Sequence, residues 1–227
     1  RNHNPDDSLA GLPWHPHRGI ETRSHVLAGH VDHGDSLGNR GSLGAGDVQW
    51  MTAGSGIMHQ EMPQGDAQGR MHGFQLWANL PASLKMTAPR YQDIAAADIP
   101  EVVDDDGTRV RVIVGDFWGK QGPVEGVAAD PQYIDVSVPP GTRKRLTVDG
   151  TRHTIAYVLA GQGSVSDASD PKGVRAAAKG GLADAHRGQT GHRALGTVAH
   201  GVEGDAAEGG ERRRGVTVTG RQVRRQG

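Results

Sequence analysis

Short apolar runs separated by glycine-containing turns dominate the first 80 residues. Runs with strand character occur at 24–29 (SHVLAG), 47–51 (DVQWM) and 73–78 (GFQLWA), and turns such as 53–56 (AGSG) separate them. Short runs of β-branched and aromatic residues between glycine turns are typical of strands. No long stretch carries helical periodicity, so the pattern predicts an all-β domain, a sandwich or barrel, over residues 1–80.

A second β-rich unit is predicted beyond a segment that contains three prolines. Residues 81–108 carry these prolines and an acidic turn, DDDG, which is typical of a connector. Apolar runs and proline- or glycine-containing turns resume within residues 109–173, where a second barrel is expected.

The pattern decays in the C-terminal tail, residues 174–227. This tail is rich in Gly, Ala and Arg and contains two basic clusters. A nucleic-acid-binding tail is one interpretation. The absence of interleaved aromatic residues favours a disordered or aberrant end, such as a shifted reading frame would produce. The second barrel is then expected to be incomplete, with exposed sheet edges.

Composition narrows the classes of function. The net charge is -1 and the pI about 6.9, so bulk charge predicts neither nucleic-acid nor membrane binding. There are no cysteines, which excludes disulfides, thiolate ligands and a cysteine nucleophile. No apolar run approaches the roughly 20 residues of a membrane span, and no signal-peptide pattern is present. A monomeric cytoplasmic protein is expected, and the first residue, Arg1, is typical of a fragment.

Two short motifs carry the candidate chemistry: His15-Pro16-His17 and His59-Gln60-Glu61. Side chains two apart on a strand point to the same face, so each motif directs two metal-type ligands one way. With 12 histidines in the chain, one such motif could arise by chance. A second motif after a glycine-rich turn makes four converging ligands the better interpretation. Three imidazoles and a carboxylate suit a redox-active divalent metal and leave about two octahedral positions open.

Four sequence blocks resemble the pirin family of the cupin superfamily. They are residues 14–22 (WHPHRGIET), 46–62 (GDVQWMTAGSGIMHQEM), 71–81 (MHGFQLWANLP) and 90–94 (RYQDI). The resemblance covers about residues 1–173. It implies a bicupin, two antiparallel jelly-roll β-barrels packed face to face, with one metal in the N-terminal barrel.

The resemblance also implies the ligands and the reaction. The metal ligands would be His15, His17, His59 and Glu61, with Fe(II) expected and Mn, Cu, Ni or Zn as alternatives. Some family members resemble quercetin 2,3-dioxygenases, which implies a flavonol-like aromatic substrate and O₂. Glu61 would then take the substrate proton, because a metal lowers the pKa of a bound hydroxyl.

Two other functions stay open. Family members also act as metal-dependent co-regulators, so a non-catalytic protein whose metal redox state controls a protein partner is the main alternative. A sugar-isomerase-like cupin with Zn(II) ranks last, because those enzymes carry a different motif spacing.

Several further residues have a functional and a purely structural interpretation. Glu21 is either an acceptor behind a metal-bound histidine or a solvated strand carboxylate. The 54–56 turn (GSG) is expected to redirect the chain into the His59 strand; a phosphate loop is the weaker alternative, because no lysine or strand-to-helix context accompanies it. Three aromatic residues belong either to the barrel core, which is favoured, or to the mouth of a pocket: Trp50, Phe74 and Trp77. His72 either bonds a backbone carbonyl, which is favoured, or lies near the metal. Three further histidines are better explained by solvent-facing strand positions than by extra metal sites: His25, His30 and His33.

Overall fold

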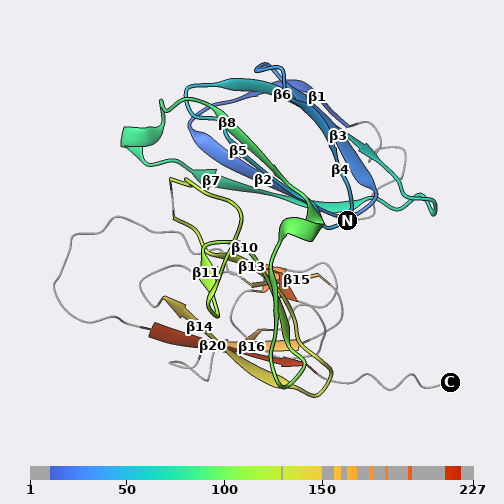
Figure 1. The fold of residues 1–227 in the computed structure, drawn as a ribbon, viewed down its shortest axis with the longest axis vertical. Helices are drawn as coiled ribbons and strands as arrows, with labels where there is room; N and C mark the ends of the chain where they lie inside the picture. The colour runs from blue at the N-terminus through green and yellow to red at the C-terminus, as the bar shows by residue number, and fades with distance from the viewer. Residues whose placement is uncertain are drawn as a thin grey trace. The chain divides into compact units, whose positions relative to one another are not determined.

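The computed structural model describes residues 11–128, 130–149, 156–159, 163–167, 174–175, 182–183, 194–195 and 213–220. The chain divides into two compact units, one of residues 1–99 with 126–129 and one of residues 100–125 with 130–227. The described residues lie mainly in antiparallel strands and turns, so the predicted all-β class is confirmed (Figure 1). The described helices are single 3₁₀ turns, η1 (Ala82–Leu84) and η2 (Ala96–Asp98), and none of them could span a membrane.

The first unit contains two four-stranded antiparallel sheets, in the strand orders β1-β6-β3-β4 and β7-β2-β5-β8. This is the layered arrangement expected of a jelly roll. The strands are β1 (Leu12–His17), β2 (Ile20–Ala28), β3 (His30–Asp35), β4 (Arg40–Leu43), β5 (Val48–Thr52), β6 (Ile57–Gln64), β7 (His72–Asn79) and β8 (Arg90–Ile94).

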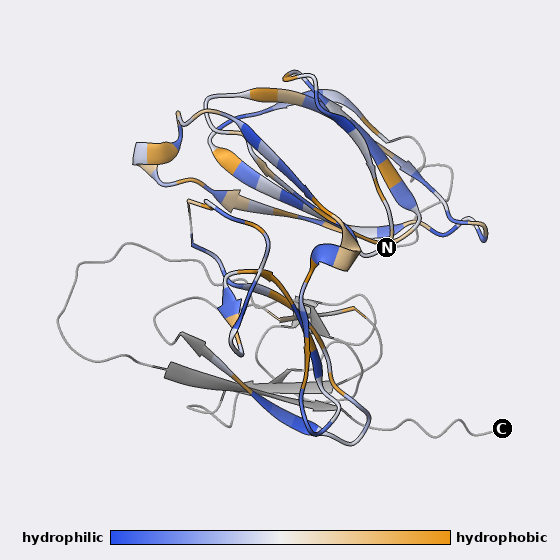
Figure 2. Cartoon of the chain, in the orientation of Figure 1, coloured by the Kyte–Doolittle hydropathy of each residue, from blue (hydrophilic) through white to orange (hydrophobic). Residues whose placement is uncertain are grey.

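Alternating hydropathy along these strands builds the core of the first unit (Figure 2). One apolar cluster joins Val26, Val31 and Leu43, with Met71 packed against it. Another cluster centres on Met51 and lies against partly buried Ile20 and Tyr91. Since successive residues of a strand face opposite sides, these clusters fix which residues of β2 and β5 point between the two sheets.

The glycine turn between β5 and β6 has the expected role. Gly54 has φ +51°, in the left-handed region that glycine adopts without steric cost. A Cβ at this position would collide with the carbonyl oxygen of Thr87. The turn therefore sets the path on which the chain enters β6, the strand that carries His59 and Glu61.

The second unit also contains antiparallel sheets, in the orders β18-β15-β19-β13-β10-β9 and β14-β20-β16-β17, with a separate β11-β12 hairpin. Its described core includes Val110, Val112, Ile134 and Val136. The strands are β9 (Glu101–Val103), β10 (Arg109–Val114), β11 (Asp116–Phe117), β12 (Lys120–Gln121), β13 (Tyr133–Ser137), β14 (Arg143–Asp149), β15 (Ala156–Val158), β16 (Gly163–Asp167), β17 (Val174–Arg175), β18 (Leu182–Ala183), β19 (Ala194–Leu195) and β20 (Arg213–Gly220).

Two stretches differ from the sequence prediction. The expected connector, 81–108, is shared between the units, because β8 pairs with β5 and β9 pairs with β10. The tail expected to lack structure contains four strands, and β20 pairs with both β14 and β16. Strand β20 contains the alternating run Val216-Thr217-Val218-Thr219, whose β-branched residues favour a strand despite the surrounding Gly and Arg.

Candidate metal centre

The two histidine motifs meet because β1 and β6 are antiparallel neighbours. His15 is the direct cross-strand partner of His59. The Nε2 atom of His15 lies 3.1 Å from Nε2 of His17 and 2.9 Å from Nε2 of His59. Glu61, two residues along β6 from His59, has Oε2 4.0 Å from His59 Nε2. All four residues predicted as ligands therefore lie together on one face of the β1-β6 pair.

The hydrogen bonding of His15 directs a lone pair into this cluster. Its Nδ1 lies 2.8 Å from the carbonyl oxygen of Pro13, which can only accept a hydrogen bond. In the neutral imidazole Nδ1 therefore carries the proton and Nε2 the lone pair. A backbone carbonyl in this place is a common means of orienting a metal-bound histidine.

The spacing of the nitrogens is compatible with one metal ion. At metal–nitrogen distances of about 2.1 Å, ligands at right angles lie about 3.0 Å apart and tetrahedral ligands about 3.4 Å apart. The observed 3.1 and 2.9 Å are compatible with neighbouring ligand positions around one ion. Among the described residues, the ligand atoms of His15, His17 and His59 lie within 4.8 Å of one another, close enough to hold one metal ion.

Glu61 is held through both carboxylate oxygens. Ser24 Oγ donates to Oε1 at 2.8 Å, and Gln75 Nε2 donates to Oε2 at 2.6 Å. The indole Nε1–H of Trp77 donates to Gln75 Oε1, also at 2.6 Å. Sequence reasoning did not single out Ser24 or Gln75. The available signal was that Gln75 and Trp77 form another i, i+2 pair, on the strand after the ligand strand.

A cavity of about 360 Å³ adjoins Glu61. Its polar wall includes Ser24, Glu61 and Gln75, and the rest of its lining is mainly apolar, including Leu12, Val26, Val31, Pro63, Met71 and Phe74. Apolar pockets with a few converging polar groups are the usual form of small-molecule sites. The carboxylate of Glu61 therefore borders both the histidine cluster and a space that could receive an apolar molecule.

Burial keeps the imidazoles ready to bind a cation. Burial lowers the pKa of His59 to about 4, against the opposing effect of the Glu61 charge. The pKa of His17 is also lowered, first by burial and then by the neighbouring His15. Both rings are thus neutral near pH 7, which is the protonation state that a metal requires.

Glu21 fits neither of its two expected roles. It does not accept a hydrogen bond from a histidine of the cluster, and it does not face solvent. It is buried, and its Oε1 accepts a hydrogen bond of 2.8 Å from Thr52 Oγ1. Ser24 reaches Glu61 from the same strand, and strand alternation places Glu21 on the opposite face from Ser24. Within the described residues, Pro13, Ser24 and Gln75 make the supporting contacts instead.

The prediction that His25 and His33 face solvent is wrong, because both are buried. The hydroxyl of Tyr91 lies 2.5 Å from His33 Nδ1, and His33 Nε2 lies 3.3 Å from Asp93 Oδ2. Burial, followed by the charge of Asp93, raises the pKa of Tyr91. Strand β3 lies between β6 and β4, and its inward-facing positions accept a histidine because polar partners from β8 meet it there. His30 is partly buried.

The three aromatic candidates occupy three different environments. Trp50 is fully buried in the first unit, whereas Trp77 is 58% exposed with its ring centroid 5.0 Å from that of His17. Phe74 lines the cavity beside Glu61. His72 is exposed, contacts the Phe74 ring and lies outside the histidine trio.

Comparison with known proteins identifies relatives of this chain. Residues 1–78 match the Pirin family model. The chain is 47% identical over 162 residues to a pirin-like protein of Caulobacter vibrioides, an alignment that covers 71% of this chain. The chain spans 58% of the length of that relative.

Solved structures share the fold. A quercetin 2,3-dioxygenase from Acinetobacter baumannii superposes with a TM-score of 0.64 and 29% identity, covering 93% of this chain and 68% of that one. The bacterial pirin YhhW from Escherichia coli, solved in complex with nickel(II), gives a TM-score of 0.54 at 22% identity and covers 94% of this chain and 78% of that one. The second likeness bears on the fold alone.

Proposed function

The chain belongs to the pirin family, and we propose that its first unit binds Fe(II) through His15, His17, His59 and Glu61 and oxygenates a flavonol-like aromatic compound. One observation carries this proposal. Three imidazoles form a group that could hold a metal ion, and the carboxylate of Glu61, 4.0 Å from His59 Nε2, borders a mostly apolar cavity that is large enough for a small aromatic molecule. Mn, Cu, Ni and Zn are the alternative metals for the same ligands.

The residues around the cluster have distinct parts in this proposal. A bound divalent metal supplies a Lewis acid that lowers the pKa of a coordinated substrate hydroxyl. Glu61 borders the cavity, lies 4.0 Å from His59 Nε2, and would accept that proton. Ser24 and Gln75 hold the Glu61 carboxylate in place, and the apolar walls offer a surface on which an aromatic substrate would pack.

Oxygen uptake tests the proposal directly. Protein loaded anaerobically with Fe(II) is mixed with quercetin under air, and oxygen consumption is followed with an electrode while flavonol absorbance is recorded. We expect consumption that depends on both iron and quercetin, and its loss in His59→Ala. His72→Ala is the control, because His72 is exposed and outside the trio. If iron-loaded wild-type protein consumes no oxygen with any flavonol, the proposed oxygenase activity is excluded.

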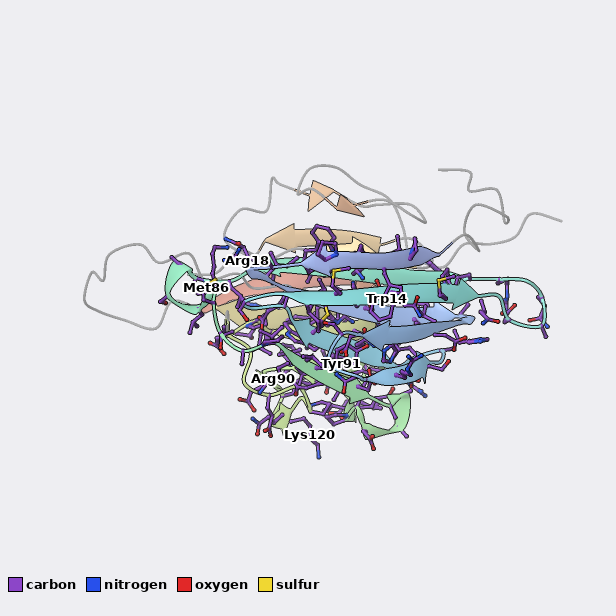
Figure 3. The ribbon with its side chains drawn as sticks, turned by 90° about the horizontal axis from the view of Figure 1, so that it is seen from above. Trp14, Arg18, Met86, Arg90, Tyr91 and Lys120 are labelled. Atoms are coloured by element: carbon purple, nitrogen blue, oxygen red, sulfur yellow. The ribbon has the colours of Figure 1, made fainter. Side chains whose placement is uncertain are left out.

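A regulatory role is the second candidate, and the outer face of the ligand strands favours it. Trp14 (labelled in Figure 3) and Met58 are 47% and 40% exposed on β1 and β6, the strands that carry the metal ligands. Pro16, the cross-strand partner of Met58, is also exposed. This candidate predicts negligible turnover together with different hydrogen exchange on β1 and β6 in the Fe(II) and Fe(III) forms. Identical exchange in the two forms would argue against it.

A further inference from the structure

A continuous chain of hydrogen bonds runs from the exposed indole of Trp77 to the carboxylate of Glu61. Trp77 Nε1–H donates to Gln75 Oε1 at 2.6 Å, and Gln75 Nε2 donates to Glu61 Oε2 at 2.6 Å. An indole N–H can only donate and a carboxylate can only accept. The indole and the carboxylate therefore fix the orientation of the Gln75 amide. In the flipped orientation, the amide oxygen would face the carboxylate and the amide NH₂ would face the indole N–H, so neither hydrogen bond could form.

We propose that Gln75 is a positioning residue for Glu61, and that Trp77 acts on the metal site by fixing the Gln75 amide. The inference rests on the proposed metal site, because its effect is exerted through a ligand of that site. Hydrogen-bond partners behind metal ligands commonly change metal affinity by about 10–100-fold.

The position of Trp77 distinguishes this role from a simple packing role. Its ring centroid lies 5.0 Å from that of His17, in an edge-on contact, while its Nε1 serves Gln75. Its side chain is 58% exposed, so the indole contributes little to the buried core. Replacing Trp77 by Phe keeps an aromatic side chain at this position of β7, removes the N–H donor to Gln75 and makes the ring smaller.

Co(II) titration of the full chain provides the test, because the visible absorption of Co(II) reports both affinity and ligand geometry without turnover. The proteins are wild type, Trp77→Phe, Gln75→Leu and the double variant. We expect Gln75→Leu to weaken Co(II) binding about 10–100-fold. We expect Trp77→Phe to weaken it several-fold and to shift the absorption bands in the same direction. In the double variant the Phe substitution should add nothing, because its route through Gln75 is already gone.

Gln64→Leu is the matched control. Gln64 lies at the end of β6, and its Nε2 donates an exposed hydrogen bond of 2.7 Å to Asp32 Oδ2. Its loss should leave Co(II) affinity and absorption unchanged.

Three results would overturn the inference. The first is wild-type affinity and absorption in Gln75→Leu. The second is an effect of Trp77→Phe that adds in full to that of Gln75→Leu, since Trp77 would then act through His17 alone. The third is unchanged absorption in Trp77→Phe, which decides the matter even if Gln75→Leu does not fold. Failure of the wild type itself to bind Co(II) would instead remove the proposed metal site, and this inference with it.

Discussion

His15 and His59 are direct cross-strand partners whose Nε2 atoms lie 2.9 Å apart. The proton on Nδ1 of His15 is engaged by the Pro13 carbonyl, so the lone pair of its Nε2 faces the neighbouring ring. In antiparallel sheets, side chains directly opposite one another are the closest pairs between strands. The pairing register of β1 and β6, rather than either motif alone, therefore creates the candidate metal centre.

His59→Ala should abolish stoichiometric metal binding. His59 Nε2 lies 2.9 Å from His15 Nε2 and 4.0 Å from Glu61 Oε2, so its loss removes the nitrogen that lies between these two groups. We expect metal content after reconstitution and desalting to fall from near one ion per chain to below about one-tenth, by elemental analysis. His72→Ala should retain its metal, and equal metal content in the two variants would contradict the assignment of His59.

The metal-free protein should lose stability as the pH falls from about 6.5 to 4. Burial lowers the pKa of His59 to about 4 in the folded state, against an ordinary value of 6.5, so the unfolded chain binds the proton more tightly within this interval. The lowered pKa of His17 acts in the same direction. Urea unfolding at several pH values measures the slope.

His59→Gln provides the comparison for that slope, because it removes the titrating group and keeps a polar side chain. Its unfolding free energy should vary less between pH 6.5 and 4 than that of the wild type. Parallel curves for the two proteins would show that His59 does not contribute to the pH dependence.

The sequence predicted the all-β class and the residues that come together at the candidate site. The all-β class is confirmed. Within each motif, a strand period of two directs both side chains to one face, His15 with His17 and His59 with Glu61, whatever the partners of those strands. The sequence could not supply the residues behind the ligands. Ser24 and Gln75 reach Glu61 from β2 and β7, and only the order of strands in the two sheets brings them there.

The burial of His33 was missed for a similar reason. A histidine in a polar segment resembles a surface residue in the sequence, but its neighbours Tyr91 and Asp93 are some 60 positions away. In the tail, the glycines and arginines outweigh one β-branched run in the composition, and that run pairs with β14 and β16. Local composition predicts elements well only where the partners of an element are also local.

Gly54→Ala should destabilise the first unit. The substitution places a side chain at φ +51° and against the Thr87 carbonyl oxygen, so conformational strain and a steric collision add. We expect a loss of more than about 2 kcal/mol in unfolding free energy by urea denaturation. Gly69→Ala is the control: Gly69 has φ +72°, but a Cβ added there would meet no atom within 4 Å, so this variant should lose only about 1 kcal/mol.

Tyr91→Phe should destabilise the first unit through His33. The Tyr91 hydroxyl is the partner of the buried His33 Nδ1 at 2.5 Å, and phenylalanine fills the same space without replacing that contact. Leaving one member of a buried hydrogen bond without its partner costs about 1–3 kcal/mol. Urea denaturation should give a lower midpoint with an unchanged m-value, because the surface exposed on unfolding stays the same. A loss below about 0.5 kcal/mol would indicate that the hydroxyl and His33 are not coupled. Since neither side chain is a proposed ligand, Co(II) affinity should change much less in Tyr91→Phe than in Gln75→Leu.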